Sequence, residues 1–248
     1  MHSIEMRHRA ERLHRGGATW SEISTALGVA RSTLRAWHVD ESAPSAADQC
    51  PRCSSGATRP DAYAALLGYY LGDGHLSKHP RYFSLRITCD DRWPGIIADV
   101  VDSLRGVRAA GKVYQVHRPG CRDVTSLWKH WPCLFPQHGP GPKHSRAIVL
   151  EEWQRAIVTT YPADFVRGLM HSDGSRVRNW ATRVVEGERR RYDYPRWQFS
   201  NRSADIRDLM CWALDLLEVP WRRSSPVHVS VSRRAAVARL DELIGPKR

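Results

Sequence analysis

The 248-residue sequence has no long hydrophobic run. No stretch approaches the roughly 18 consecutive apolar residues that a membrane-spanning helix requires. The opening residues, MHSIEMRHRAERLHRGG, also lack the apolar segment of a secretory signal. These absences exclude integral membrane proteins and exported proteins, so we expect a cytoplasmic protein with no membrane partner.

Cysteine is scarce and irregularly spaced. Six cysteines without an export signal do not indicate a disulfide framework. The one Cys-x-x-Cys pair, Cys50 and Cys53, can supply two of the four ligands of a structural Zn²⁺ ion. The sequence does not choose between such a site and two solvated thiols. The candidates for the remaining ligands are Cys121, His130, Cys133, His138 and His144.

Lysine is also rare. Of the 38 Lys and Arg residues only five are lysines, at positions 78, 112, 129, 143 and 247, and the net charge is +12. A guanidinium group binds phosphate oxygens and guanine edges in a forked geometry. The charge therefore favours a polyanionic partner and a location at the nucleoid, although a GC-rich coding bias would also raise the arginine content.

Residues 1–40 form the first predicted domain, with helices at 7–15, 20–27 and 31–37. A tight turn at 28–30 gives the last two helices the pattern of a helix-turn-helix, with Val29, Leu34 and Trp37 in its core. The alternative is a helical hairpin that only packs or dimerises. The residues expected to face the DNA major groove are Arg31, Ser32, Thr33 and Arg35.

After a predicted linker at 41–60, rich in Ala, Ser and Pro, the chain contains an internal repeat. The first copy, within residues 61–160, contains LLGYYLGDG, which ends at Gly74. The second, within residues 161–248, contains VRGLMHSDG, which ends at Gly174. The repeated Asp-Gly pairs place Asp73 and Asp173 at equivalent positions.

The elements after each motif follow one order. A hairpin at 75–89 and one at 176–200, with a charged turn at 186–190, each lead into a helix, and Ser203 is the expected N-cap of the second. We therefore predict an α+β fold in which each repeat has the order αββαββα. The other predicted elements are strands at 112–118, 121–128, 221–224 and 227–232 and helices at 93–104, 150–159, 203–217 and 233–244. Segment 128–139 is interpreted as core with a polar edge.

The two motifs and the order of elements resemble the single-chain LAGLIDADG, or DOD-type, homing endonucleases over residues 61–248. The resemblance implies a DNA-binding saddle and Mg²⁺-dependent cleavage. Its catalytic metal ligands would be Asp73 and Asp173, which would share two or three Mg²⁺ ions with the backbone at Gly72 and Ser172. The departures from the family pattern are at positions 71 and 171, where Leu and His replace an Asp that is variable in the family and not catalytic.

The resemblance also implies a basic residue near the metal ions. Lys143 precedes the third helix of the first repeat, where many relatives carry a lysine that stabilises the phosphate or positions water. An ordinary phosphate contact is the alternative for Lys143. The second repeat has no clear counterpart, and the nearest basic residues are Arg222 and Arg223. The strand residues expected to contact DNA are Ser84, Arg86, Thr88, Arg176, Arg178, Arg196, Gln198 and Ser200.

Small residues in the motifs predict a close helix pair. Gly68 and Gly72, like Gly168 and Ser172, lie four residues apart and therefore on one helix face, where two backbones can approach closely. The approach would bring two carboxylates together at negative helix ends, and a divalent cation would relieve their repulsion. The glycine after each Asp is expected in the left-handed conformation that ends many helices.

Two functions fit these features. One is a site-specific DNA endonuclease, and the other is a transcription regulator on a catalytically inactive LAGLIDADG scaffold. Retention of both motif Asp residues favours the enzyme. An intein is not expected, because the chain starts with Met and ends in Gly-Pro-Lys-Arg without a His-Asn splice signal. We expect a monomer that binds double-stranded DNA.

Overall fold

The computed structural model describes residues 2, 4–39, 49–53 and 58–247. The chain forms two compact units, Met1–Gln49 and Cys50–Arg248. Of the predicted linker, residues 50–53 and 58–60 group with the larger unit, while 41–48 and 54–57 lie outside the described residues. None of the helices in the described part of the chain combines the length and apolar character needed to cross a bilayer.

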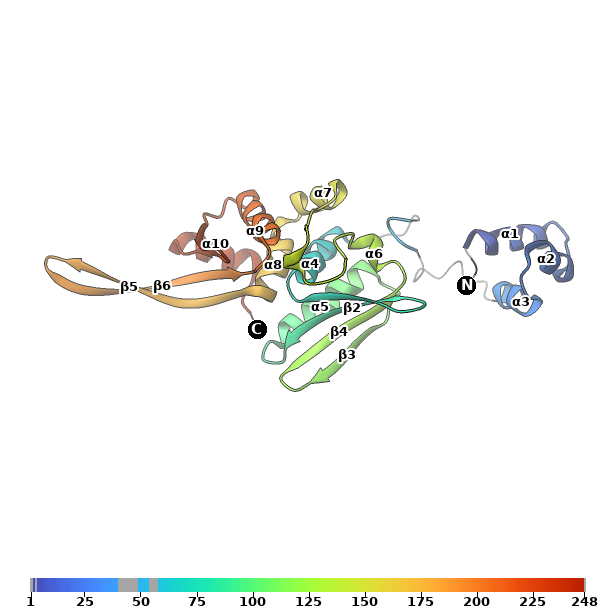
Figure 1. The fold of residues 1–248 in the computed structure, drawn as a ribbon, viewed down its shortest axis with the longest axis horizontal. Helices are drawn as coiled ribbons and strands as arrows, with labels where there is room; N and C mark the ends of the chain where they lie inside the picture. The colour runs from blue at the N-terminus through green and yellow to red at the C-terminus, as the bar shows by residue number, and fades with distance from the viewer. Residues whose placement is uncertain (1, 3, 40–48, 54–57, 248) are drawn as a thin grey trace. The chain divides into compact units, whose positions relative to one another are not determined.

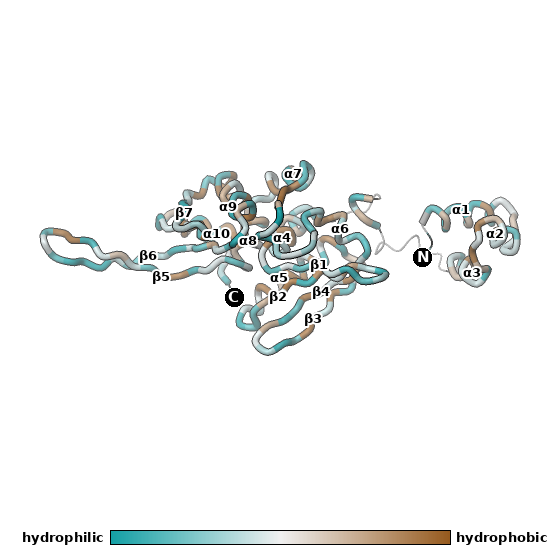
Figure 2. The backbone as a smooth tube through the Cα atoms, in the orientation of Figure 1, coloured by the Kyte–Doolittle hydropathy of each residue, from teal (hydrophilic) through white to brown (hydrophobic). Residues whose placement is uncertain are grey.

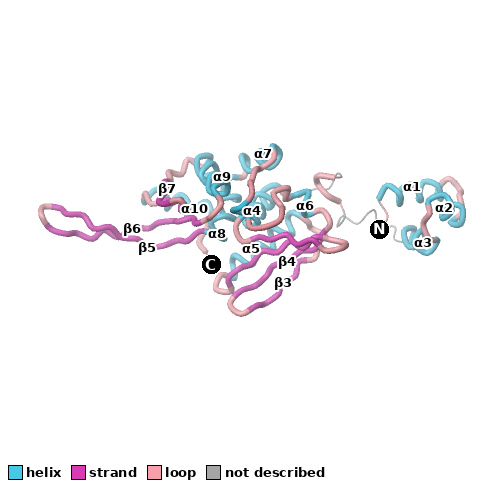
Figure 3. Tube along the Cα trace, viewed as in Figure 1, coloured by secondary structure: helices cyan, strands magenta, loops and turns pink. Residues whose placement is uncertain are grey.

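The smaller unit consists of three helices, α1 (Ile4–Arg15), α2 (Trp20–Leu27) and α3 (Arg31–Val39) (Figure 3). Thr19 and Glu22 form a reciprocal capping box at the start of α2, and Gly28 ends the helix with a left-handed φ of 64°. The predicted helices and their core are confirmed. The buried residues of this core are Ala10, Ile23, Val29 and Leu34, with Trp37 packed at its edge.

The larger unit contains two successive sets of elements. The first set is α4 (Pro60–Leu71), β1 (Gly74–Lys78), β2 (Phe83–Asp90), α5 (Pro94–Val107), β3 (Val113–Arg118), β4 (Cys121–Trp128), α6 (Trp131–Leu134), the 3-10 turn η2 (Lys143–Ser145) and α7 (Glu152–Thr160). The second set is α8 (Pro162–Asp173), β5 (Gly174–Val185), β6 (Glu188–Ser200), α9 (Ala204–Leu216), β7 (Arg222–Ser225), β8 (His228–Val231) and α10 (Arg234–Ile244). The short elements α6 and η2 were not predicted.

Each set contributes one four-stranded antiparallel sheet, and the two sheets have the same topology (Figure 3). The strand orders are β1-β2-β4-β3 and β5-β6-β8-β7. Side chains alternate between the two faces of each sheet. One face is buried against helices and includes Leu85, Ile87 and Cys89 of β2 and Trp197 and Phe199 of β6. The predicted α+β fold of two pseudo-symmetric repeats is confirmed.

Helices α4 and α8 lie side by side where the two repeats meet (Figure 1). A Cβ atom built on Gly68 would lie 2.4 Å from the backbone oxygen of Phe165. One built on Gly168 would lie 2.2 Å from the backbone oxygen of Ala65. Since no side-chain carbon fits at such distances, the contact between the two helices requires glycine at both positions.

The glycines that follow the motif Asp residues, Gly74 and Gly174, do not have the predicted role of ending a helix in the left-handed conformation. Gly74 and Gly174 begin strands β1 and β5, and Gly174 has a φ of −96°, so a left-handed conformation was the wrong expectation. A Cβ atom on Gly74 would lie 2.4 Å from the Cα of Tyr70, and one on Gly174 would lie 2.6 Å from the backbone oxygen of Met170. These glycines let each strand turn back tightly against its own helix.

The β5–β6 hairpin extends well beyond the rest of its sheet (Figure 1). β5 pairs with β6 along its whole length, whereas β8 pairs only with residues 197–200 of β6. Hydrophilic and hydrophobic stretches alternate along the hairpin (Figure 2). Its turn is Glu186 and Gly187, with φ of 55° and 84°, and is shorter than the predicted turn at 186–190. Two left-handed residues match the twist of a hairpin, so the strands pair up to the turn.

Segment 128–139 is core with a polar edge, as predicted. Trp131 and Phe135 are fully buried, and the Trp131 Nε1 donates a 3.0 Å hydrogen bond to the backbone oxygen of Ser126. The Tyr63 hydroxyl of α4 donates a 2.6 Å hydrogen bond to the backbone oxygen of Leu134. The short helix α6 is thereby fixed against α4.

Candidate active site at the paired helix ends

The two motif carboxylates lie where α4 and α8 end. Asp173 is the last residue of α8, and Asp73 stands two residues beyond the end of α4. A Cβ atom built on Gly72 would lie 2.4 Å from the Cβ of Ser172 and 3.4 Å from the Oδ2 of Asp173. Close packing of the helices therefore brings the two carboxylates to one place, at the negative ends of both helix dipoles.

Both carboxylates resist ionisation. Burial and the negative charge of Asp173 raise the pKa of Asp73 to about 6, although Lys143 and Lys247 oppose the shift. Burial also raises the pKa of Asp173, against a 2.6 Å hydrogen bond that the Asn201 Nδ2 donates to its Oδ2. Since each carboxylate has lost part of its hydration and faces another acid, a bound cation would stabilise the charged forms of both.

Lys143 lies at these carboxylates. It is the first residue of η2, and its ammonium group donates a 2.8 Å hydrogen bond to the backbone oxygen of Gly72. Its Nζ lies 5.1 Å from the centre of the Tyr70 ring, a favourable position for a cation. Burial lowers the pKa of Lys143 to about 8, opposed by the two Asp residues, so the group is mostly protonated at neutral pH.

A second lysine, Lys247, occupies the equivalent place in the other repeat. Its Nζ donates a 3.3 Å hydrogen bond to the backbone oxygen of Ser172, the residue that corresponds to Gly72. Burial lowers the pKa of Lys247, and the two carboxylates oppose this shift. Lys143 precedes α7, the last helix of the first repeat, whereas Lys247 follows α10, the last helix of the second repeat. The two lysines therefore reach similar places from different points along the chain.

Sequence reasoning missed Lys247, and neither of the arginines that it named lies at the paired carboxylates. Arg222 lines a separate small pocket beside β7, and Arg223 forms an ion pair with Asp208. A signal was present in the composition, because lysine is rare in this chain and two of its five lysines lie at the site. A compact ammonium group, unlike a guanidinium, fits a confined place and changes its pKa readily.

Two cavities flank the helix ends. One, of about 840 Å³, is lined by Asp73 and Lys247, and the other, of about 410 Å³, is lined by Asp173 and Lys143. Each lysine donates its hydrogen bond to a carbonyl of its own repeat but shares a cavity with the Asp of the other repeat. Each cavity is therefore built from both repeats.

The two departures from the family motif are core residues. Leu71 is fully buried, and His171 is buried with its Nδ1 3.3 Å from the Tyr69 hydroxyl. Burial lowers the pKa of His171 to about 4, so the ring is neutral at physiological pH. Tyr69 also donates a 2.6 Å hydrogen bond to Asp99. Leu71 and His171 thus pack in the core beneath the helix ends, and neither replaces one of the two motif carboxylates.

The face of the first sheet that is turned away from the helices is polar. Ser84, Arg86 and Thr88 of β2 share it. Asp123 lies opposite Thr88 on the neighbouring strand β4 and is 3% exposed. It accepts a 2.8 Å hydrogen bond from the Thr88 hydroxyl and forms a 2.8 Å ion pair with the Arg118 Nε. Its Oδ2 is also 3.8 Å from Arg86. One buried carboxylate thus orients three polar side chains of this face.

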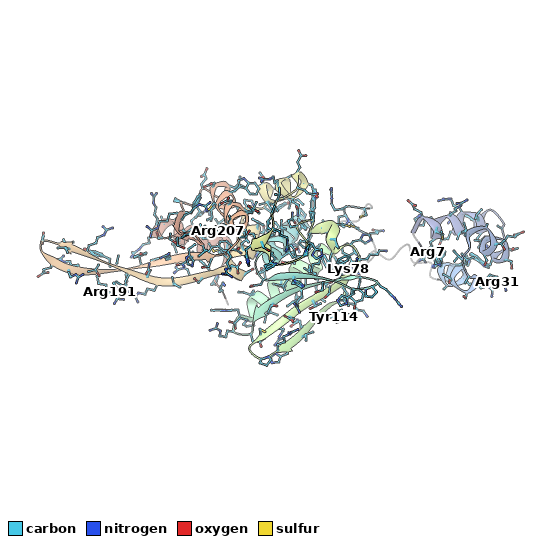
Figure 4. The ribbon with its side chains drawn as sticks, viewed as in Figure 1. Arg7, Arg31, Lys78, Tyr114, Arg191 and Arg207 are labelled. Carbon is cyan, nitrogen blue, oxygen red and sulfur yellow. The ribbon has the colours of Figure 1, made fainter. Side chains whose placement is uncertain are left out.

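The corresponding face of the second sheet carries Arg196, Gln198 and Ser200 of β6. The Arg196 NH2 donates hydrogen bonds of 2.7 Å to the Ser230 hydroxyl and 3.1 Å to the Ser224 hydroxyl. Sequence reasoning did not single out the exposed aromatic residues near these faces. They include Tyr192 on the hairpin and Tyr114 on β3, each 45% exposed; Figure 4 labels Tyr114 and also Arg191 on the hairpin.

Arg176 and Arg178, predicted for the same surface, lie on the opposite face of the hairpin. The strand register pairs Arg176 with the buried Trp197. Arg176 forms a 2.8 Å ion pair with Asp241 of α10, and Arg178 lies 3.4 Å from Asp193. Strand alternation places them there, because even-numbered residues of β5 share the face of Trp197 while even-numbered residues of β6 do not.

In the smaller unit, the four predicted contact residues lie on α3, of which Figure 4 labels Arg31. Arg31, Ser32 and Arg35 are exposed, and Thr33 is half-buried. The Arg31 NH1 donates a 3.2 Å hydrogen bond to the hydroxyl of Ser21 on α2. These residues form a polar surface beside the buried Leu34.

The cysteine pair has two of its candidate partners beside it. Cys50 and Cys53 lie next to His130 and Cys133. The other three candidates lie elsewhere: Cys121 begins β4, and His138 and His144 line the cavity that contains Asp173.

Comparison with known proteins gives similarity in structure but not in sequence. No protein-family profile matches the chain, and no curated protein matches its sequence. The structure of I-DmoI in complex with DNA and Mn matches with 14% identity over 76% of this chain and 98% of that one, at a TM-score of 0.46. LAGLIDADG meganuclease I-AabMI bound to uncleaved DNA matches with 11% identity over 73% and 82%, also at 0.46. Both similarities are at low sequence identity.

Proposed function

We propose that this protein is a divalent-metal-dependent endonuclease that cleaves both strands of double-stranded DNA. The observation that carries the proposal is the pair of composite cavities at the ends of α4 and α8. Each is lined by one motif carboxylate and one lysine, and these two residues come from different repeats. Two equivalent acid–lysine sets suit a substrate with two equivalent strands, one phosphodiester for each set.

The oxygen ligands at the helix ends fit Mg²⁺. Asp73 and Asp173 would hold the ions, with the backbone oxygens of Gly72 and Ser172 nearby. Each of these backbone oxygens already accepts a hydrogen bond from a lysine ammonium group, so the place favours positive charge. Bound there, Mg²⁺ would supply an activated water molecule and neutralise charge on the leaving oxygen.

The lysines complete the proposed chemistry. Water attacks phosphorus and loses a proton to solvent, the bond from phosphorus to the leaving oxygen breaks, and the leaving oxygen takes a proton from solvent. Lys143 and Lys247 would each donate hydrogen bonds to a nonbridging phosphate oxygen and so stabilise the charge that develops during attack. Their lowered pKa values reflect partial burial, in which a hydrogen bond to phosphate is stronger than in water.

The polar faces of the two sheets would hold the DNA. Arg86 with its buried partner Asp123, and Arg196 with its serine partners, are fixed in orientation and therefore suited to reading base edges. The smaller unit would add affinity through the polar surface of α3, as a second DNA-binding module on the same chain. The net charge of +12 supports the long contact with phosphates that this requires.

The test is to incubate the full-length protein with a pooled plasmid library of random sites, with and without Mg²⁺, and to sequence the resulting ends. We expect Mg²⁺-dependent double-strand ends that share one long sequence. Recovery of a bound sequence without any cut ends in Mg²⁺ or Mn²⁺ would contradict the endonuclease. It would favour instead a transcription regulator built on an inactive scaffold.

A further inference from the structure

We infer that Cys50, Cys53, His130 and Cys133 bind one structural zinc ion. One ligand atom from each residue lies within 4.8 Å of the others. The sulfur atoms of Cys53 and Cys133 are 3.5 Å apart, and the Cys133 sulfur is 3.7 Å from the His130 Nδ1. Zn–S bonds of about 2.3 Å and Zn–N bonds of about 2.0 Å give tetrahedron edges of about 3.8 Å and 3.5 Å. The two distances differ from these edges by about 0.3 Å and 0.2 Å, so small side-chain adjustments would complete a tetrahedral site.

The four ligands come from two turns of the same form. Each turn offers ligands at positions i and i+3 with a proline between them, in Cys-Pro-Arg-Cys and in His-Trp-Pro-Cys. The Cys53 N–H donates a 3.2 Å hydrogen bond to the backbone oxygen of Cys50, and the Cys133 N–H donates a 3.0 Å hydrogen bond to that of His130. Backbone N–H groups of Arg52 and Cys53 also point to the Cys50 sulfur, an arrangement that supports a thiolate ligand.

The ligand types select the metal and its role. Three sulfur atoms and one imidazole nitrogen are the ligands of zinc and not of Mg²⁺, which prefers oxygen. Four protein ligands close a tetrahedral site and leave no position for substrate, as in structural rather than catalytic zinc centres. The cluster is therefore separate in its chemistry from the carboxylate pair, and it does not depend on the proposed function.

The metal would fix the first residues of the larger unit to its core. Cys50 is fully buried, and the Arg52 guanidinium lies 4.6 Å from the centre of the Trp153 ring of α7. On the other side, α6 is held by the buried Trp131 and by the hydrogen bond from Tyr63. Zinc would thus join residues 50–53 to a rigid part of the first repeat. Its removal should release this segment and leave the two sheets folded.

The experiment measures metal in full-length protein purified from zinc-containing medium and dialysed to remove loosely bound ions. We expect about one zinc per chain, by elemental analysis, in the parent. Cys53→Ser and Cys133→Ser should each lower the zinc content at least about tenfold. Cys121→Ser is the control, because Cys121 is half-buried like Cys133 but lies outside the cluster, and this variant should keep the metal.

A second measurement does not depend on the folding of any variant. Metal-free parent protein reconstituted with Co²⁺ should show the intense visible bands of tetrahedral coordination and the near-ultraviolet bands of thiolate ligands. A parent without zinc and without these bands would overturn the proposal. So would a zinc content that both serine variants retain, or a disulfide between Cys53 and Cys133 shown by mass spectrometry in freshly purified protein.

Discussion

The two repeats of the larger unit are alike at their helices and differ in their sheets. At the helices, equivalent glycines meet, equivalent carboxylates lie where α4 and α8 end, and equivalent backbone oxygens each accept a lysine hydrogen bond. In the sheets, the first repeat has strands of five to eight residues. The second combines the long β5–β6 hairpin, with strands of 12 and 13 residues, with two strands of four.

The difference follows from what each region must satisfy. Where two backbones pack in contact, any added carbon collides with main-chain atoms that cannot move, so the repeats stay alike. The outer strands meet solvent on at least one face, and their lengths can change without disturbing the core. The symmetric part is suited to chemistry that both DNA strands share, and the asymmetric part is suited to reading two different half-sites.

Breaking the symmetric part should have the largest effect. Gly168→Ala places a Cβ 2.2 Å from the backbone oxygen of Ala65, which forces α4 and α8 apart. We expect a loss of at least about 3 kcal/mol in the free energy of unfolding, or about 10 °C in Tm. Gly139→Ala is the control, because its Cβ would meet only the flexible Arg146 side chain at 3.3 Å. Equal melting temperatures of the two variants would contradict the close helix contact.

The two lysines test whether each cavity serves one DNA strand. Lys143→Met and Lys247→Met should each lower cleavage about 100- to 1000-fold, because each removes a half-buried donor to the phosphate. Each should slow one strand more than the other, since each lysine lies in a different cavity. Strand-resolved kinetics on a selected site measure this effect. Lys112→Met, on the surface before β3, should leave both rates unchanged. Equal slowing of both strands by each site variant would contradict the two composite cavities.

The two faces of the long hairpin can be separated by a matched pair of arginines. Arg196→Ala removes a guanidinium from the polar face and should weaken specific DNA binding about tenfold. Arg176 lies on the opposite face and pairs with Asp241. Arg176→Ala should therefore lower the free energy of unfolding by about 1 kcal/mol and change the Kd for DNA by less than about twofold. Binding titrations and thermal unfolding of both variants test the assignment. The reverse pattern would mean that the hairpin presents its other face to DNA.

The smallest effect is on the pH dependence of stability without metal. Because the folded-state pKa of Asp73 is raised to about 6, its contribution to stability is complete below about pH 4 and is lost as the pH rises through 6. Metal-free Asp73→Asn should therefore gain stability over the parent between pH 4 and 7. The gain should be only a few degrees in Tm, because the Asp73 side chain still reaches solvent and water screens its charge. For a unit of this size, 1 kcal/mol corresponds to about 2–4 °C in Tm. Added Mg²⁺ should remove the difference, and parallel stability curves would contradict the raised pKa.

Much of the fold follows from sequence pattern. The hairpin predicted at 75–89 corresponds to β1 and β2, and Ser203 was correctly predicted as the N-cap of α9. The repeated motif predicted which glycines meet, because small residues four apart mark one face of a helix. These features depend on local spacing, which a sequence displays directly.

The features that sequence did not predict depend on distance in space. Lys247 reaches Ser172 from the end of the chain, 75 residues later, with no motif around it. Cys53 and Cys133 are 80 residues apart, so the choice among five possible partners needed the folded core. The sequence did not show that Arg176 and Arg196 lie on opposite faces, because the register of β5 against β6 is set by the two-residue turn at Glu186 and Gly187.

The most direct test of the central claim is strand-resolved cleavage of a selected, tightly bound site in Mg²⁺ by the parent, Asp73→Asn and Asp173→Asn. Asn keeps the size of the side chain but removes a charge and a strong Mg²⁺ ligand, so each variant should cleave at least about 1000-fold more slowly. Binding should persist with a Kd within a few fold, and Asp208→Asn, on the exposed surface of α9, should behave as the parent. Absence of cleavage by the parent in both Mg²⁺ and Mn²⁺, or cleavage that either site variant retains, would contradict the account.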